Sequence, residues 1–584
     1  MKILKEKCFL PALLLCSFLT MIYFGIQKEG YHVDEVYSYG LANSEYLPFM
    51  HFGESGYSVK DWMMDYGAGE SLGDLFRNLW KDYQILRECD FQWRESVIYR
   101  DYLVAQANSA DTRTTTWMSG QDYQDYIAVS KTNTFNYASV YYNQRGDVHP
   151  PLYYMLLHTV CSIFQGRFSK WFGLGINIVI LLLTQIVLYK MVETYLGGRT
   201  TAMATVAAYG LSCGVISTAV FLRMYALLTF LIVACCAVHL KIFAEDFCLK
   251  GRNAFLLMLT VLSGYMTHYY FVLYAIGMAA VFVVLLAVRK RWRTIIQYIM
   301  LLAVTAAVGL VIWPFAIKHV FQGYRGNAAI NILVHREFYL IKVKVMIYRI
   351  AEQMLHGNSW ILWLMFAALL GLMVWKRGRG LPIGKGAVAV LPAAFYFVVT
   401  AQIVPELIDR YVMCMYPFLC LFIVVGAALL IRSCLRESWF HRSVTVVGIL
   451  FLLLNNVYLH TPNYLISGGQ QTVVLSSNTD CVYVLPDDDW NESAVDSTIL
   501  AQCRRVAVVY ESSLEVLQDT YQYQLGDLVM VAIQQDMDIE TVLGEVRAVL
   551  GIENLPEIGR LDGSIAVRIF LADGAFIKDT NFSQ

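Results

Sequence analysis

Two adjacent carboxylates are the first residues in this sequence that could do chemistry. Asp34 and Glu35 stand in KEGYHVDEVYSYGLANSEY, residues 28–46, directly after an apolar run. Neighbouring residues of a helix point about 100° apart, so the two carboxylates cannot share one task symmetrically. One of them could act as a general base on an acceptor hydroxyl while the other orients it or the acceptor. A plain acidic cap at a helix end is the alternative interpretation.

A second motif, RGDVHPPLYYMLLH at residues 145–158, places Asp147 and His149 just before two prolines. Pro150 and Pro151 restrict the backbone and are tolerated where a helix begins. The motif therefore predicts a rigid helix start whose N–H groups face an anion near the membrane surface. A simple helix initiator would have the same pattern.

Three arginines are predicted at outer helix ends or in an outer loop: Arg223 in FLRMYALLTF, Arg325 in GYRGN and Arg410 in PELIDRYVMCMYPF. A charge at membrane depth is costly and usually has a partner. Arginine binds phosphate through parallel hydrogen bonds, which favours a phosphate site. Snorkelling to lipid head groups is the alternative. His268 in MTHYYF, also predicted outside, either lines the same cavity or packs at the interface.

The composition places most of the chain in a membrane. Of the 584 residues, 57% are hydrophobic and only 16% are charged, whereas about a quarter of the residues of soluble proteins are charged. The formal net charge of -1 gives no sign of nucleic-acid binding. The sequence contains no CxxC pair, HExxH, G-x-S-x-G or phosphate-binding glycine loop, so it gives no support for a metal site or for soluble hydrolytic chemistry.

About eleven apolar segments approach the length of about 20 residues that a membrane-spanning helix needs. They lie near residues 8–26, 171–189, 202–222, 225–243, 254–268, 270–288, 294–317, 358–375, 386–404, 411–431 and 443–460. The basic loops RKRWR, KRGRG and RSCLRESWFHR favour the cytoplasm, which predicts a cytoplasmic N-terminus and an outer C-terminus. Segment 149–164 is short for a crossing and is predicted to be re-entrant or interfacial. If it crosses and one span is missed, the total is about thirteen.

We therefore expect an all-α, multi-pass protein of the cell membrane with a small additional domain. A first transmembrane helix (1–26) precedes a long extracytoplasmic loop (27–148) that carries the Asp-Glu pair. Residues 149–460 contain the short helix and the remaining spans, with an amphipathic outer loop at 318–357. Strand-like runs and a helical segment in residues 461–584 are typical of a small extracytoplasmic α/β domain.

Taken together, the Asp-Glu pair, DVHPPLYYML, RMYALL, THYYF and DRYVMCMYPF resemble the family 39 glycosyltransferases over roughly residues 8–460. This family includes the protein O-mannosyltransferases and the aminoarabinose-type lipid A transferases, which have the GT-C membrane fold. The resemblance implies that Asp34 is the catalytic base and that Glu35 helps to orient it or the acceptor. It also implies that His149 and the 147–152 turn shape the pocket and that the three arginines are candidates for holding the donor phosphate.

The family uses a polyprenyl-phosphate sugar as donor, so the expected activity is hexosyl or pentosyl transfer to an acceptor hydroxyl. Direct displacement would invert the anomeric centre, and a phosphate paired with arginine is a good leaving group, so this chemistry does not require a metal. The acceptor would be a protein, a glycolipid or a cell-wall polymer. A transporter or flippase for a lipid-linked glycan is the alternative, and a receptor that binds glycan without turnover is another. Charges outside the spans and the lack of an internal repeat favour the transferase.

Overall fold

The computed structural model describes residues 9–49, 80–81, 83–84, 87, 117–321, 339–435, 437–467, 475, 478–487, 492–520, 528–534, 537–562 and 566–571. The chain divides into two compact units. Unit 1 comprises Met1–Lys28, Asp147–Leu157 and Ser169–Leu465. Unit 2 comprises Glu29–Gly146, His158–Phe168 and Ile466–Gln584.

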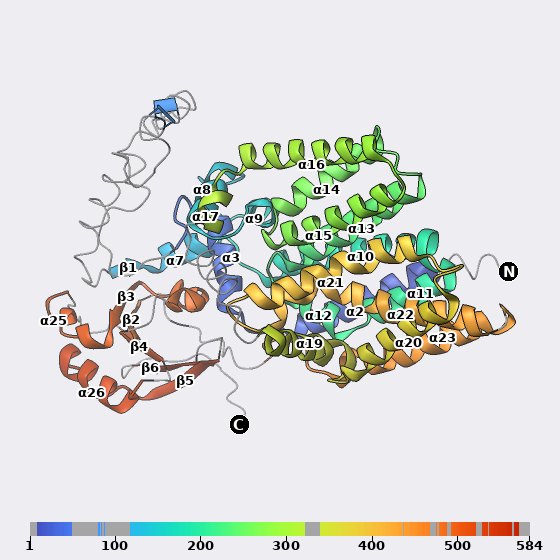
Figure 1. Cartoon of the computed structure of the whole chain (residues 1–584). Coiled ribbons are helices and arrows are strands. Elements are labelled where there is room, and N and C mark those ends of the chain that lie inside the picture. Colours follow the sequence, from blue (N-terminus) through green and yellow to red (C-terminus); the bar gives the residue numbers. More distant parts are fainter. Residues whose placement is uncertain are drawn as a thin grey trace. The chain divides into compact units, whose positions relative to one another are not determined.

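Unit 1 is a bundle of apolar helices, in which α15 packs along α21 and α10 packs along α13 (Figure 1). The helices are α2 (Phe9–Gln27), α9 (Leu152–Ile163, shared with unit 2), α10 (Lys170–Met191), η2 (Val192–Leu196), α11 (Gly198–Gly210), α12 (Cys213–Val220), α13 (Tyr225–Ala244), α14 (Arg252–Tyr265), α15 (Tyr270–Val288), α16 (Trp292–Ile312), α17 (Phe315–Phe321), α19 (Tyr339–Leu355), α20 (Trp360–Lys376), α21 (Ile383–Ile403), η3 (Asp409–Met415), α22 (Tyr416–Cys434), α23 (Glu437–Leu454) and η4 (Val457–Leu459).

In the part of the chain that the structure describes, seven helices are long and apolar enough to cross a membrane. They are Phe9–Gln27, Lys170–Leu196, Tyr225–Ala244, Tyr270–Val288, Trp292–Ile312, Ile383–Ile403 and Asp409–Cys434. Helices α19 and α20 meet at a bend of 97° and would add an eighth span if they count as one. The predicted segment 202–222 is divided between α11 and α12, because Ser212 accepts a hydrogen bond from the N–H of Val215 (3.1 Å) and begins a new helix.

Buried polar side chains join neighbouring helices of unit 1. Gln185 on α10 donates a hydrogen bond to the Ser17 hydroxyl of α2 (2.8 Å), which in turn donates to the carbonyl of Gly210 on α11 (2.6 Å). Asn177, also on α10, donates to the carbonyls of Ala219 (3.1 Å) and Phe221 (2.8 Å) at the end of α12. Such interhelical hydrogen bonds hold helices together where lipid and core are equally apolar.

Unit 2 contains a mixed sheet of six strands in the order β1-β3-β2-β4-β6-β5. Strand β2 is parallel to β3 and β4, whereas the pairs β1–β3, β4–β6 and β5–β6 are antiparallel. The elements are α3 (Val33–Asn43), β1 (Trp117–Ser119), α7 (Gly120–Ile127), α8 (Tyr137–Gly146), β2 (Thr479–Leu485), η5 (Glu492–Asp496), α24 (Ser497–Leu500), β3 (Arg505–Tyr510), η6 (Glu511–Ser513), α25 (Val516–Thr520), β4 (Leu528–Gln534), α26 (Ile539–Leu550), β5 (Glu557–Asp562) and β6 (Ala566–Leu571).

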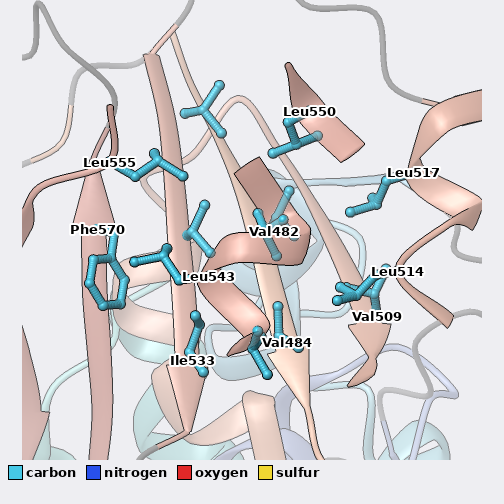
Figure 2. Close-up of a cluster of buried hydrophobic side chains, with 14 of the residues drawn as sticks. Val482, Val484, Val509, Leu514, Leu517, Ile533, Leu543, Leu550, Leu555 and Phe570 are labelled. Carbon is cyan, nitrogen blue, oxygen red and sulfur yellow. The ribbon is translucent and has the colours of Figure 1, made fainter. Parts of the chain in front are cut away.

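The core of this sheet forms where α26 covers one face. Val482, Val484 and Ile533 of the central strands lie against Leu543 and Leu550 of the helix (Figure 2). Alternate residues of a strand point to the same face, which is why the two valines of β2 share this core.

One strand of the sheet comes from the long first loop. Trp117 of β1 is paired with Ala507 of β3, and the guanidinium of Arg505 lies over the Trp117 ring at 4.6 Å. The first loop and the C-terminal segment, which lie far apart in the sequence, therefore contribute to one unit. The structure confirms the predicted class, a mainly helical multi-pass membrane protein with a small α/β region towards the C-terminus.

Candidate functional site

The Asp-Glu pair stands in the first turn of α3, in unit 2. His32 caps this helix: its Nδ1 accepts a hydrogen bond from the N–H of Asp34 (3.1 Å), and its own N–H donates to Oε2 of Glu35 (2.8 Å). This reciprocal arrangement is a capping box. Glu35 is completely buried, whereas 19% of the Asp34 side chain is exposed. The two carboxylates therefore have different surroundings, and of the two only Asp34 is partly exposed.

The position of α3 depends on a glycine. A Cβ atom at Gly40 would lie 2.1 Å from Cζ of Tyr126 on α7, so only glycine lets the two helices approach this closely. The Asn43 side chain at the end of α3 also donates to the carbonyl of Ile127 (2.7 Å). These contacts fix the helix that carries Asp34 within unit 2.

The second predicted motif lies in unit 1, where Asp147 and His149 form a pair. Oδ2 of Asp147 and Nδ1 of His149 are 2.7 Å apart, and both side chains are largely buried. Pro150 and Pro151 follow. The backbone N–H of Met155 donates a hydrogen bond to the Pro151 carbonyl (2.9 Å) in the first turn of α9. The N–H of Leu152 donates to the carbonyl of Met266 (3.0 Å). That N–H thus fixes the turn against the end of α14 and is not available to an anion.

The charges around Asp147 make this carboxyl a poor general base. Burial by itself raises the pKa of the Asp147 carboxyl, but the charge and hydrogen bond of His149 and the charge of Arg223 outweigh burial and lower this pKa well below its usual range. Asp147 is therefore ionised at neutral pH and is a weak proton acceptor. It serves to orient His149 and to balance the charge of Arg223.

Aromatic rings connect this pair with a second polar cluster of unit 1. The His149 and His268 rings lie 5.5 Å apart, and His268 lies 5.8 Å from the ring of Tyr225. Tyr225 stacks with Phe221 (5.5 Å, 12°), which stacks with Tyr464 (4.0 Å, 19°). Stacked rings of this kind form a rigid, amphipathic wall.

The second cluster surrounds Asp409, at the start of η3. Its carboxylate is buried and accepts hydrogen bonds from Asn463 (2.8 Å), Tyr464 (3.1 Å) and Tyr416 (3.2 Å). The next residue, Arg410, is only 8% exposed and forms an ion pair with Glu406 at 3.6 Å. Burial and the nearby Asp409 raise the pKa of Tyr464 well above its usual range, so this hydroxyl remains protonated and donates.

Two of the predicted arginines are buried at junctions between helices of unit 1. Arg223 is 5% exposed and lies between α12 and α13, where its N–H donates to the carbonyl of Phe221 (2.7 Å). Arg410 precedes α22, and its guanidinium lies 5.2 Å from the centre of the Tyr411 ring. The Tyr411 ring in turn contacts the ring of Tyr270. The third, Arg325, lies outside the described residues.

The structure thus brings Asp147, His149, His268 and Arg223 together, and Arg410 is connected to His268 through the rings of Tyr411 and Tyr270. Sequence reasoning missed Asp409, although it precedes Arg410 directly, and the rings of Phe221 and Tyr225 on either side of Arg223. It also missed Lys28 at the end of α2, which is buried and donates to the carbonyl of Tyr464 (2.9 Å). Lys28 is the first residue of the stretch 28–46 that contains Asp34. A charged residue directly after an apolar helix was the sequence feature that could have identified it.

Among the residues that the structure describes, no three His, Cys, Asp or Glu side chains gather closely enough to hold a metal ion. The described buried cations of this part of unit 1 are Lys28, Arg223 and Arg410, and the carboxylates of Asp147 and Asp409 lie near them.

Fold and site together define a multi-pass helical membrane protein with buried cationic groups at its helix junctions. The sequence matches no protein-family model and no curated protein. Its structure is similar to that of ArnT from Cupriavidus metallidurans in the apo state, with a TM-score of 0.44 and 15% identity, covering 74% of this chain and 89% of that chain. The crystal structure of the same protein bound to undecaprenyl phosphate gives a TM-score of 0.41 and 14% identity over the same shares.

Proposed function

We propose that the protein is a GT-C-type glycosyltransferase that moves a sugar from a polyprenyl-phosphate donor to an acceptor hydroxyl at the outer face of the membrane. The observation that carries this proposal is the burial of Arg223 and Arg410 at helix junctions of unit 1. The charge of Arg223 lowers the pKa of Asp147, and Arg410 is connected to His149 through the rings of Tyr411, Tyr270 and His268. A lipid phosphate has the charge and the membrane depth that this arrangement fits. The resemblance to family 39, with its Asp-Glu pair and HPPL motif, supports the same assignment.

In this mechanism the arginines bind the donor phosphate and stabilise the charge that develops on it. Arg223 and Arg410 are the described candidates, and Arg325 remains a third. Lys28 adds a positive charge near Tyr464. No metal ion is needed for the departure of the phosphate, because guanidinium groups provide the compensating charge.

Asp34 is proposed as the general base. It takes the proton of the acceptor hydroxyl while the acceptor oxygen forms a bond to the anomeric carbon. The bond from that carbon to the phosphate oxygen breaks, and the polyprenyl phosphate leaves with the electron pair. A single displacement of this kind inverts the anomeric centre. Glu35 supports the reaction by holding the helix start that carries Asp34.

The test uses the full chain in lipid with a set of radiolabelled polyprenyl-phosphate hexoses and pentoses, and with membrane or cell-wall extract as acceptor. We expect the wild type to transfer one of the sugars and Asp34→Asn to lose at least a hundredfold in rate, the lower end of general-base contributions being about that size. Asp125→Asn, at an exposed position on α7, is the matched control and should keep full activity.

Two outcomes would contradict the proposal. Transfer that survives Asp34→Asn would show that this carboxylate is not the base. Failure of every donor, combined with movement of a labelled lipid-linked glycan between the leaflets of vesicles containing the protein, would assign it to the transporters instead.

A further inference from the structure

A large apolar cavity lies in unit 1, away from the residues of the candidate site. It has a volume of about 380 Å³ and is lined by α20, α21 and α22, with Leu196, Gly197 and Phe440 completing the wall. This volume falls within the range of about 300–1,000 Å³ that is typical of small-molecule sites. The lining is apolar almost throughout, so the space suits a hydrocarbon chain.

The cavity extends along α22 from Leu421 to Arg432. Arg410 belongs to η3, which leads directly into α22, whereas the lining residues of α22 extend to Arg432 in its last turn. The stretch from Tyr416 to Arg432 corresponds to about 24 Å along a helix. The lining residues of α22 begin at Leu421, so none of the residues of the proposed donor site lines the cavity, and Arg432 lies at the end of the cavity away from Arg410.

A single charged side chain, Arg432, lines this otherwise apolar space. Its guanidinium lies over the Phe440 ring at 4.5 Å, and its side chain is exposed. The turn KRGRG at residues 376–380 joins α20 to α21, and the cavity is lined by Met373, three residues before it, and by Leu381, directly after it. Basic groups beside a pocket between membrane helices attract anionic lipid head groups.

We propose that this cavity binds an acyl chain of an anionic phospholipid whose head group pairs with Arg432 and the basic turn. Charge complementarity favours this occupant over the chain of a polyprenyl-phosphate donor. The far end of a polyprenyl chain is uncharged and would gain nothing from an arginine at the cavity mouth. An anionic phospholipid satisfies both the apolar lining and the positive charge.

Two glycines provide a matched pair of variants. Gly386 on α21 lines the cavity, and Gly371 on α20 does not; a Cβ atom at either position meets no atom within 4 Å. Gly386→Leu therefore adds a side chain at the cavity wall where its Cβ meets no neighbouring atom, while Gly371→Leu adds the same side chain elsewhere on a helix. The exposed Arg432 permits a third variant, Arg432→Gln, which removes the charge and leaves the cavity open.

The measurement is native mass spectrometry of the full chain in detergent, titrated with phosphatidylglycerol or phosphatidylcholine of the same acyl chains. Wild type and Gly371→Leu should retain phosphatidylglycerol preferentially, and Gly386→Leu should lose this tightly bound lipid. Arg432→Gln should weaken phosphatidylglycerol binding about fivefold, which corresponds to about 1 kcal/mol for one arginine, and should leave phosphatidylcholine binding unchanged.

Three results would each overturn the proposal. Retention of phosphatidylglycerol by Gly386→Leu at the wild-type level would place the lipid elsewhere. Equal binding of the two phospholipids by both the wild type and Arg432→Gln would reduce the site to non-selective lipid contact. Displacement of phosphatidylglycerol by polyprenyl phosphate in the wild type, together with weaker polyprenyl-phosphate binding by Gly386→Leu, would make the cavity part of a donor site. None of these results depends on transfer activity, so they are separate from the test of the proposed function.

Discussion

At the scale of single residues, the sharpest contrast is between the adjacent carboxylates of α3. Glu35 is buried and accepts the hydrogen bond that closes the capping box, whereas Asp34 donates its backbone N–H to His32 and keeps its side chain partly exposed. Proton transfer at Glu35 would disturb the hydrogen bond by which its carboxylate caps α3. This contrast is why the proposal gives the proton-transfer step to Asp34 alone.

The contrast predicts different effects on stability. Glu35→Ala removes the acceptor for the N–H of His32 and should lower the free energy of unfolding by about 1 kcal/mol, the usual cost of losing a helix cap. Asp34→Ala leaves the capping box intact and should change stability by less than about 0.5 kcal/mol. The measurement is the thermal unfolding midpoint of both variants in the same lipid. Equal losses of stability would mean that Asp34 is as structural as Glu35.

At the scale of elements, β2 and η5 hold a buried carboxyl that links folding to pH. Asp496 at the end of η5 is almost completely buried and accepts a hydrogen bond from the Tyr483 hydroxyl of β2 (2.8 Å). Burial raises the pKa of Asp496 from 3.8 to about 7, although the hydrogen bond opposes this. The native carboxyl therefore holds its proton at pH values where the unfolded chain has lost it.

The stability of unit 2 should consequently fall as the pH rises. Between about pH 4 and pH 7 the native state binds one more proton than the unfolded state, so the free energy of unfolding decreases across this window, by an amount on the order of a few kcal/mol. Asp496→Asn, which carries no titrating proton, should flatten the dependence. Unfolding of the full chain by denaturant at pH 5 and pH 8 measures this pH dependence for the wild type and for Asp496→Asn. Asp125→Asn, on the exposed face of α7, is the control. A wild type that is equally stable at both pH values would contradict the assignment.

The same scale shows which elements a sequence can predict. Long apolar runs predict α2, α13, α15 and α16, because hydropathy alone decides whether a segment enters a membrane. The break between α11 and α12 depends on the local cap at Ser212, which interrupts an apolar run without changing its hydropathy. Strand β1 has three residues, too few for an alternating pattern, and its place in the sheet is decided by pairing with β3.

At the scale of the whole molecule, the candidate residues depend on contacts between distant segments. The sequence motifs predicted the candidate residues one by one. The structure shows which of them meet, because it brings Asp147 close to Arg223 and His149 close to His268. No spacing in the sequence predicts that Asn463 and Tyr464 donate to Asp409, since these residues come from separate segments that meet only in the folded bundle. The sequence therefore predicted candidates, while the network that surrounds them required the fold.

A hydrogen bond inside the helix bundle, made by Asn177, should determine the position of Arg223. Asn177 on α10 donates to the carbonyls of Ala219 and Phe221, directly before Arg223, so Asn177→Leu should loosen the junction between α12 and α13. We expect a loss of stability of about 1–2 kcal/mol, typical of an interhelical hydrogen bond, and a several-fold higher KM for the polyprenyl-phosphate donor. Gln185→Leu on the same helix removes the equivalent bond to Ser17 and is the matched control: it should lose similar stability and keep the KM. Steady-state kinetics and unfolding midpoints of both variants measure this, and an equal rise of KM in the two would show that Arg223 does not depend on Asn177.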